Sequence, residues 1–442
     1  MDRKYKWIAV LLLSHSALAT EYEYSLGTSG SSSTNVTQRP DGQEGSVYQA
    51  DLTFDISDEN LYDWQIDFAS SLSRLNYDND ELADETRSNI RLESTYQPKD
   101  TNFSLMLFGD LSQVPANRFQ TEEVNNLRDS QTVAFSPNYF VRLDSQTDIN
   151  LNYQHIDYQV EDSGPIVAQV DNSRTAQSAS FSLNRQINAT NRLSLVLQET
   201  DNDYDNDEQV NTFDFRQSDQ ILRWVVVNAT NEMQLDLGNS NVDGASGQKA
   251  SEEQMRFSWN RQMNSRQSVT LELFEGVANL ININAASGTI SINPQANALF
   301  RAQRSESGTF QYEYNTGLVS FRAQIFETNL FGIFADNDEI RRGHDITLST
   351  SLSRLLSSPL QRLLTFRYSD TETDFNIIGN SIEENRIKQS FIRYDHVSSS
   401  TLSFYSTFEK REAKQLDRNL GIIPNTSEYF TLGFVYRDRG QW

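Results

Sequence analysis

The sequence contains no cysteine, and this absence removes two classes of exported protein. A small scaffold held together by disulfide bonds is excluded, and so is a metal site built from thiolates. Histidine is scarce as well. His155, His344 and His396 show none of the spacings of metal ligands, so we expect them to lie at the surface or at a membrane interface. We therefore expect no metal site and no cofactor.

Positively charged residues are few relative to negatively charged ones. The chain has 37 Lys and Arg against 61 Asp and Glu, a formal net charge of −24. Nucleic acid is excluded as a partner, because its recognition needs clustered basic side chains that contact phosphates. Long apolar runs are also missing. Beyond the N-terminus no stretch approaches the roughly 18 consecutive apolar residues of a membrane-spanning helix.

The sequence also lacks the motifs of enzymes. It contains no G-x-S-x-G nucleophile motif and no glycine-rich loop of the kind that binds nucleotide phosphates. No combination of nucleophile, base and acid stands out elsewhere. We therefore expect no catalytic residue and no enzymatic activity.

The N-terminus has the three parts of a secretory signal peptide. Arg3, Lys4 and Lys6 make a basic start, an apolar run from Trp7 to Leu13 follows, and Ala17-Leu18-Ala19 forms a small-x-small cleavage site. We expect residues 1–19 to be removed after Ala19, and residues 20–442 to form the mature protein. The chain is then exported, either as a soluble protein or as one that crosses an outer membrane with strands.

Apolar and polar residues alternate along almost the whole mature chain. In "WQIDFASSL", Trp64, Ile66 and Phe68 occupy one parity and polar or small residues the other. A period of two is typical of a strand with one apolar and one polar face. The 25 Phe, 18 Tyr and 5 Trp argue against a disordered chain. The pattern predicts an all-β fold, a single large transmembrane antiparallel up-and-down β-barrel of about 18–20 strands in the outer membrane of a Gram-negative bacterium.

Short and long connections alternate between the expected strands. The short ones include residues 98–100, 144–146 and 228–230, and the long ones include 115–127, 160–173, 241–249, 374–383 and 412–425. Short turns at one end and long loops at the other are typical of outer-membrane barrels. "SLSRLLSSPLQRLL" (351–364) also fits helical spacing, but its Ser-Ser-Pro favours a turn. An even number of strands would place both termini in the periplasm.

The C-terminal segment supports the same fold. Phe430, Leu432, Phe434, Tyr436 and the terminal Trp442 share one parity, as in the closing strand of many barrels. Asp438 and Gly440 depart from that pattern, because they occupy positions where apolar residues are expected.

The acidic string "DNDE" occurs three times, at Asp78–Glu81, Asp205–Glu208 and Asp336–Glu339. Each copy follows an expected strand, and by alternation all three links lie on the extracellular side. A helix–loop–helix calcium site starting at Asp201 would need Gly and Glu where Asn206 and Thr212 stand, so that motif fails. Solvated acidic loop tips are the favoured interpretation, and adventitious binding of divalent cations stays open.

One long link, residues 276–300, carries no charge. Two short alternating arms flank Ser287-Gly288, and each arm is too short to cross a bilayer. Two interpretations are equally favoured. The link is either a hairpin that extends two strands outward beyond the membrane or a loop that folds into the lumen and narrows it.

The parity opposite to the apolar one faces the lumen, and its charges differ between early and late strands. Since closure of the barrel brings the first and last strands together, an acidic arc should adjoin a basic arc. The alternative is that these charges simply pair with neighbours across strands. The candidate pore-lining residues are Asp51, Asp55, Asp67 and Glu93 on early strands and Arg322, Arg367, Arg411 and Arg437 on late strands.

Two stretches carry a resemblance to a known group of proteins. Ser130–Tyr158 ("SQTVAFSPNYFVRLDSQTDINLNYQHIDY") and Asn191–Asp207 ("NRLSLVLQETDNDYDND") resemble regions of large barrels associated with exosortase and exopolysaccharide gene clusters, which are grouped with β-barrel porins. The resemblance implies an outer-membrane pore that exports a polysaccharide together with a periplasmic partner. The partners expected are therefore outer-membrane lipid, a polysaccharide cargo and a periplasmic export protein.

Two functions from different classes remain open. The first is a pore for an exopolysaccharide or for polar solutes. The second is a structural or adhesive surface barrel whose acidic loops face outward and whose lumen is plugged.

Overall fold

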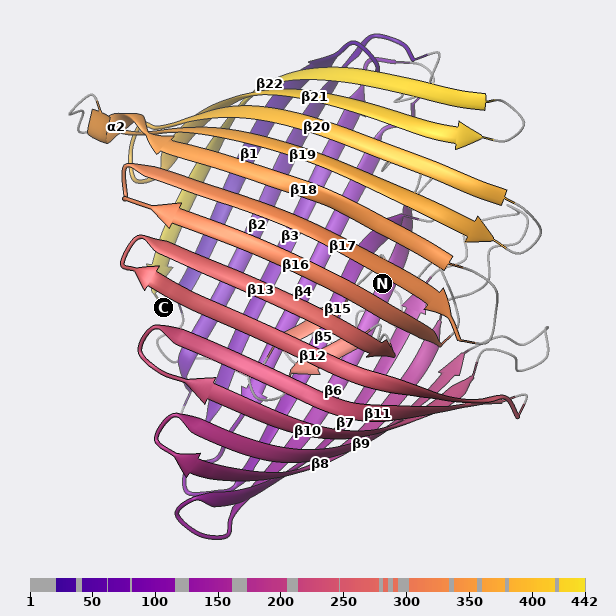
Figure 1. Ribbon diagram of the computed structural model, residues 1–442. Coiled ribbons are helices and arrows are strands. Elements are labelled where there is room, and N and C mark those ends of the chain that lie inside the picture. The colour runs from indigo at the N-terminus through magenta and orange to yellow at the C-terminus, as the bar shows by residue number, and fades with distance from the viewer. Residues whose placement is uncertain are drawn as a thin grey trace, which may run out of the picture.

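The computed structural model is almost entirely β-structure (Figure 1). The residues it describes are 21–36, 42–61, 63–79, 82–115, 127–160, 173–204, 214–245, 247–277, 281–284, 289–292, 302–333, 338–355, 360–377, 381–417 and 421–441. Its elements are β1 (Glu21–Ser33), β2 (Gly45–Leu61), β3 (Trp64–Tyr77), β4 (Glu85–Tyr96), β5 (Phe103–Pro115), β6 (Leu127–Arg142), β7 (Thr147–Val160), β8 (Arg174–Asn188), β9 (Asn191–Tyr204), β10 (Phe215–Val227), β11 (Asn231–Gly244), β12 (Lys249–Asn264), β13 (Gln267–Val277), β14 (Ile281–Asn284), β15 (Thr289–Ile292), β16 (Gln303–Asn315), β17 (Val319–Gly332), β18 (Asp338–Ser351), α2 (Leu352–Leu355), β19 (Gln361–Ile377), β20 (Ser381–Val397), β21 (Leu402–Asp417) and β22 (Gly421–Gln441).

The strands form one closed antiparallel sheet. Each strand pairs with the next one along the chain, except that β13 pairs directly with β16. β1 pairs with both β2 and β22, so the first and last strands close a 20-stranded barrel. Closure leaves no unpaired sheet edge. The predicted up-and-down barrel is confirmed, with the strand number at the upper end of the predicted range.

The two ends of the barrel differ in their connections. We call the end where β1 begins, β22 ends and the short turns lie the turn end, and the opposite one the loop end (Figure 1). The link at 351–364 lies at the turn end and contains the short helix α2, followed by β19. Among the described residues, no helix is long and apolar enough to cross a membrane.

Several links at the loop end are shorter than the alternation of the sequence predicts. β19 ends at Ile377 and β20 begins at Ser381, so most of the predicted loop 374–383 continues the two strands. The same holds for 412–425, where only 418–420 separate β21 from β22. In both segments polar residues occupy both faces of the strand. The sequence alone therefore predicts a loop, because the apolar face of a membrane strand is missing. The backbone ladder nevertheless continues, because strand pairing needs no apolar face.

The three links that contain a DNDE string all lie at the loop end. They follow β3, β9 and β17, which run in the same direction. Asp78 accepts a hydrogen bond from the backbone N–H of Ser46 at 2.6 Å, across the base of its link. Asp338 and Glu339 begin β18. Residues 80–81, 205–208 and 336–337 of the three strings lie outside the described part of the chain.

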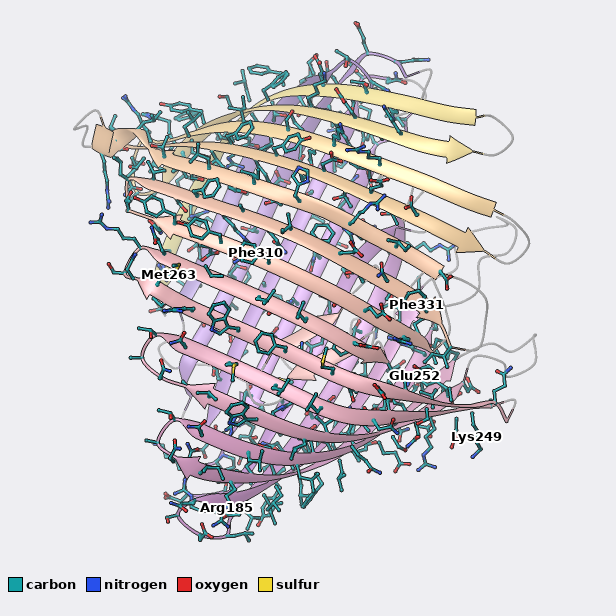
Figure 2. The ribbon with its side chains drawn as sticks, viewed as in Figure 1. Arg185, Lys249, Glu252, Met263, Phe310 and Phe331 are labelled. Atoms are coloured by element: carbon teal, nitrogen blue, oxygen red, sulfur yellow. The ribbon has the colours of Figure 1, made fainter. Side chains whose placement is uncertain are left out.

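The outward face of the barrel carries the apolar parity. Leu26, Leu52 and Leu72 are cross-strand partners on β1, β2 and β3, and they are 49%, 44% and 45% exposed. In Figure 2, Phe310 lies partway along the outer wall, whereas Lys249 lies at the loop end and Arg185 at the turn end. The wall thus has an apolar band with charged residues toward both of its rims.

The two departures in the C-terminal strand are explained by β1. The Tyr24 hydroxyl donates a hydrogen bond to the Asp438 carboxylate at 3.2 Å. Gly440 lies opposite Tyr22, and a Cβ atom at position 440 would come within 2.4 Å of the Tyr22 hydroxyl. The tyrosines of the first strand therefore cover the polar and small residues of the last one.

The charge-free link contains a small sheet of its own. β14 and β15 pair as a two-stranded hairpin with Ile281 opposite Ile292, separate from the barrel sheet. In the view of Figure 1 this hairpin lies within the outline of the barrel. The remaining residues of 276–300, apart from the end of β13, lie outside the described part of the chain.

Candidate functional site

The candidate site is the inner face of the barrel. Residues that are direct cross-strand partners point to the same face, so the register assigns each charge to one side of the wall. The outward leucines described above fix the inner parity of β1 to β3, and the ladder extends it around the barrel. The register places on the inner face all eight candidates: Asp51, Asp55, Asp67, Glu93, Arg322, Arg367, Arg411 and Arg437.

Three of the acidic candidates share one concavity at the turn end. It has a volume of about 430 Å3, and its lining includes Asp55, Asp67 and Glu93. Two of the cross-strand pairs here carry like charges, Glu23 opposite Asp55 and Asp67 opposite Glu93. Like charges directly opposite each other destabilise a sheet, so this part of the wall needs compensating groups.

Arginines and hydroxyl groups supply part of that compensation. Arg91 forms an ion pair with Glu93, and the Ser57 hydroxyl donates a hydrogen bond to Asp67 at 2.7 Å. Arg437 of β22 forms an ion pair with Glu23 at 2.9 Å. The basic residue predicted from the last strand therefore lies beside the acidic ones of the first strands, across the seam that closes the barrel.

Asp51 lies farther along β2 toward the loop end. Its carboxylate accepts hydrogen bonds from the Ser73 hydroxyl at 2.6 Å and from the Gln49 side-chain amide at 2.7 Å. It does not line the concavity. Asp51 is thus held within the wall by polar neighbours.

The arginines of the late strands also have partners on the inner face. Arg322 donates a hydrogen bond to Gln311 at 2.7 Å, and its guanidinium lies 4.0 Å from Glu313. Arg367 forms an ion pair with Asp345 at 2.7 Å. Arg322 and Arg367 belong to one cross-strand row, with Thr347 between them. Arg411 on β21 lies in a different row, opposite Gln389.

Sequence reasoning missed the carboxylates among these arginines. Glu313, Asp345, Asp395 and Glu409 occupy the same inner parity on β16, β18, β20 and β21. The late strands therefore present a mixed surface of both signs. The sequence could have predicted these carboxylates, because each one occupies the polar, inward parity of its own strand, as the arginines do on theirs.

An aromatic side chain lies among these charges near the turn end. Tyr405 on β21 faces Gly433, and a Cβ atom at position 433 would come within 2.4 Å of the Tyr405 ring. The guanidinium of Arg393 lies 4.6 Å from the centre of that ring, and its Nε also donates to Asp395 at 2.8 Å. The cation stacks on the ring and is neutralised by the carboxylate.

A second region of the inner face has a different character. We call the inner face of β5–β11 the covered arc, because each of these strands has inner residues that are less than a tenth exposed. One row crosses it as Phe108, Ala134, Ile156 and Ala176, partners on four successive strands. These residues form an apolar cluster together with Met106. Large and small side chains alternate, which lets the row fill space without a gap.

Several buried polar groups in the covered arc are paired within the wall. Arg223 donates two parallel hydrogen bonds to the carboxylate of Asp236, each at 2.9 Å. Only 5% of the Asp236 side chain is exposed. The Gln217 amide donates to Asp219 at 2.9 and 3.0 Å, and both residues are buried. Burial of these groups requires such partners.

The candidate residues lie in the opposite region. We call the inner face of β17–β22 and β1–β4 the open arc. Side chains of Arg322, Arg367 and Arg437 here are 49%, 57% and 61% exposed. Buried inner residues occur in the open arc as well, such as Glu85 and Glu339, but they lie toward the loop end. Solvent therefore reaches the predicted basic residues of the inner wall.

Two of the histidines lie on the outer face of the barrel, away from the candidate site. His155 and His344 point outward and contact aromatic rings, at 5.2 Å from Phe135 and 5.6 Å from Tyr368. Among the described residues, no three His, Asp or Glu side chains converge as metal ligands would. The described wall offers hydrogen bonds and charge rather than a metal centre.

Comparison with known proteins shows similarity of fold only. No protein-family model matches the sequence, and no characterised protein matches it in sequence. Among solved structures, the unliganded ferric citrate transporter FecA is 10% identical, with 96% of this chain and 79% of that chain covered and a TM-score of 0.46. A mutant of the ferric enterobactin receptor PfeA from Pseudomonas aeruginosa is 9% identical, with 96% and 81% covered and a TM-score of 0.49. OccAB3 from Acinetobacter baumannii is 9% identical, with 95% and 99% covered and a TM-score of 0.41.

These similarities carry no information about a transported solute. The resemblance to barrels of exopolysaccharide clusters has no matching family model behind it, so it stays a prediction.

Proposed function

We propose that this protein spans a bacterial outer membrane and forms a pore for polar solutes. The closed sheet leaves every strand paired, which a lipid environment demands of any spanning structure. Rows of exposed leucine, such as Leu26, Leu52 and Leu72, give the outer wall the apolar surface that faces lipid in such barrels. Fractionation with outer membrane and heat-modifiable mobility on gels test this placement, and a soluble, heat-insensitive protein would contradict it.

In this proposal the turn end faces the periplasm and the loop end faces the outside of the cell. The short turns, the start of β1 and the end of β22 lie at the turn end, the arrangement typical of outer-membrane barrels. Epitope tags placed in Asp78–Glu81, Asp205–Glu208 and Asp336–Glu339 should each bind antibody on intact cells. A tag that needs permeabilised cells would contradict the common orientation of the three links.

The half-exposed arginines of the open arc are the observation that carries the pore function. Side chains such as Arg367, 57% exposed on the inner face, are available to a solute that passes through the barrel. Their carboxylate partners keep the surface mixed in sign, which suits a hydrated polar chain better than a single kind of ion. Purified protein in planar lipid bilayers should conduct ions in discrete steps.

Export of an exopolysaccharide is the specific form of this function that we propose. Tyr405, Arg393 and Asp395 supply a ring, a guanidinium and a carboxylate side by side, a combination that contacts sugar hydroxyl groups and ring faces. A polymer would enter from the periplasmic side through a partner protein. Neutral and acidic oligosaccharides added to the turn-end side should block the conductance at lower concentration than polyethylene glycol of equal size. Equal block would contradict the saccharide assignment and leave the pore intact.

The second candidate is a structural or adhesive barrel with a plugged lumen. The covered arc favours it, because several of its inner residues, such as Phe108 and Gln217, are buried and offer no surface to a solute. The β14–β15 hairpin is not part of the barrel sheet, so it is available to fold into the lumen as a plug. Deletion of Asn279–Pro294 should raise the single-channel conductance if this segment narrows the lumen. No conductance in either form would favour the structural barrel.

A further inference from the structure

Lysine is rare in this chain and unevenly placed. The seven lysines are Lys4, Lys6, Lys99, Lys249, Lys388, Lys410 and Lys414. Lys388, Lys410 and Lys414 lie on the neighbouring strands β20 and β21. A protein with a net charge of −24 thus places three of its seven lysines within one part of the wall. An acidic surface that only faces solvent gives no reason for lysines to gather on two neighbouring strands.

These lysines point outward, just beyond the apolar band. They share the parity of Ile392 and Phe408, which are cross-strand partners and are 45% and 42% exposed on the outer surface. Lys410 follows Phe408 by two residues toward the loop end, a step of about 7 Å along the strand. Lys388 and Lys414 lie farther toward the same end. In a membrane, these ammonium groups would lie level with lipid head groups.

Arg386 completes this surface. It lies opposite Lys414 in the β20–β21 ladder. Its guanidinium makes two parallel hydrogen bonds to Asp370, at 2.9 and 2.8 Å. We call Arg386, Lys388, Lys410 and Lys414 the lysine patch. Because Arg386 already occupies Asp370, this carboxylate is a poor partner for a second cation.

The three lysines are held only weakly by carboxylates. Lys388 lies 3.9 Å from Asp370, and Lys410 lies 3.0 Å from Glu412 and 3.9 Å from Glu428. Lys414 is exposed and makes no ion pair with any described residue. Exposed pairs of this kind contribute little to stability. The ammonium groups can therefore turn to a more highly charged anion at small cost.

The outward belt at the loop end differs elsewhere on the barrel. On β9 its residues are Glu199, Asp201 and Asp203, with Arg216 of β10 paired to the first of them. Lys249 on β12 also points outward at the loop end (Figure 2), and it pairs with Asp243 at 3.4 Å. A concentration of lysine, interleaved with Glu412, is therefore a local feature of β20 and β21.

We propose that the lysine patch binds the phosphate groups of an anionic lipid in the outer leaflet of the membrane. Phosphate accepts hydrogen bonds from several ammonium groups at once, and the apolar rows below the patch contact the acyl chains of the same lipid. This inference rests on the membrane-spanning placement proposed above. It assigns the patch to lipid that surrounds the barrel, separate from the inner face that lines the passage.

The test compares two variants of the full chain in neutral detergent. In one, K388Q, K410Q and K414Q are combined; in the matched control, K99Q and K249Q are combined. Binding is measured with micelles of neutral detergent that contain bisphosphorylated lipid A, its dephosphorylated form, or inorganic phosphate alone. The wild-type protein and the control should prefer phosphorylated lipid A. The triple variant should lose about 100-fold in affinity, roughly fivefold for each lysine.

Three results would overturn the assignment. They are equal affinity of the triple variant and the control, equal binding of both forms of lipid A, and binding of inorganic phosphate as tight as that of lipid A. Heat-modifiable mobility shows that each variant is folded. If the wild-type protein does not fractionate with outer membrane, the membrane placement fails and the patch with it. If the wild-type protein fractionates with outer membrane and conducts ions, but the triple variant binds phosphorylated lipid A as tightly as the wild type, only the patch assignment fails.

Discussion

The covered arc and the open arc belong to one sheet and obey one alternation, yet their inner faces differ. The covered arc contains buried rows and compact pairs, such as Phe108 with Ala134 and Arg223 with Asp236, among inner residues that are partly exposed. The open arc presents long charged side chains such as Arg367 and Arg437, which are more than half exposed. Alternation therefore decides which residues face inward, but it does not decide whether an inward residue meets solvent.

Packing between neighbouring strands accounts for the buried row of the covered arc. Phe108, Ala134 and Ile156 are cross-strand partners, and their alternation of large and small side chains lets them fill the space between the strands. We infer that one arc stabilises the barrel and that the other serves the passage. Three experiments test this division, and a fourth concerns a turn outside both arcs.

The largest difference is expected between two inner phenylalanines. Phe108 in the covered arc is 4% exposed, and the Arg91 guanidinium lies over its ring at 5.3 Å. The substitution F108A should lower the free energy of unfolding by about 3–5 kcal/mol, because it leaves a cavity in a packed row. Phe391 in the open arc is only partly buried, so F391A should cost about 1 kcal/mol or less.

Urea unfolding from lipid vesicles, followed by tryptophan fluorescence, measures both changes. Equal losses for F108A and F391A would show that the open arc is packed as tightly as the covered one.

A smaller difference is expected between two ion pairs of the same chemistry. R223A removes the charged partner of the buried Asp236 and should cost about 3 kcal/mol, because the carboxylate keeps a neutral donor, the Gln234 amide at 3.0 Å, but loses its countercharge. R367A removes the partner of Asp345 in a solvated setting, where such pairs contribute about 1 kcal/mol or less. The temperature at which heat-modifiable mobility is lost should fall markedly for the first variant only. A larger fall for R367A would reverse the roles of the two arcs.

The third experiment concerns ion selectivity. If the open arc lines the passage, the combined variant R322E, R367E and R411E should shift the permeability ratio toward cations by roughly severalfold. D219N in the covered arc changes an inner charge away from the passage and should leave the ratio unchanged. Reversal potentials in a salt gradient measure both. A folded triple variant with wild-type selectivity would leave these arginines as structural residues.

The smallest effect lies outside both arcs, in the turn between β6 and β7. Hydrogen bonds from the backbone N–H groups of Gln146, at 2.7 Å, and Thr147, at 2.8 Å, hold the pKa of Asp144 below its usual 3.8. A lowered pKa in the folded state adds stability above the unfolded value, and this stability is lost as the pH falls below 3.8 and through the folded pKa. D144A should therefore narrow the gap in stability between pH 7 and pH 3 slightly. A variant with an unchanged pH dependence would contradict this contribution.

Much of the fold could be predicted because its signal is local. In "WQIDFASSL" the backbone itself sends Trp64 and Asp67 to opposite faces, so the strand, its apolar side and its inward carboxylate follow from nine residues. Repetition of that pattern determined the barrel and its strand number within a narrow range. Turns such as 144–146 were also predictable, because Asp and Ser form them through contacts with their own backbone.

Register and closure were decided only in the tertiary structure. In the sequence, Asp438 departs from the apolar pattern of a closing strand. The structure explains this departure, because Tyr24, 414 residues away in the sequence, donates a hydrogen bond to the Asp438 carboxylate. The pairing of Arg437 with Glu23, and the place of Arg439 beside Asp55, Asp67 and Glu93 in one concavity, likewise need the seam between β1 and β22. The alternation of apolar and polar residues depends only on neighbouring residues, so the sequence by itself determines it. The side chain that an inward residue meets depends on strands far apart in sequence, which only the closed barrel brings together.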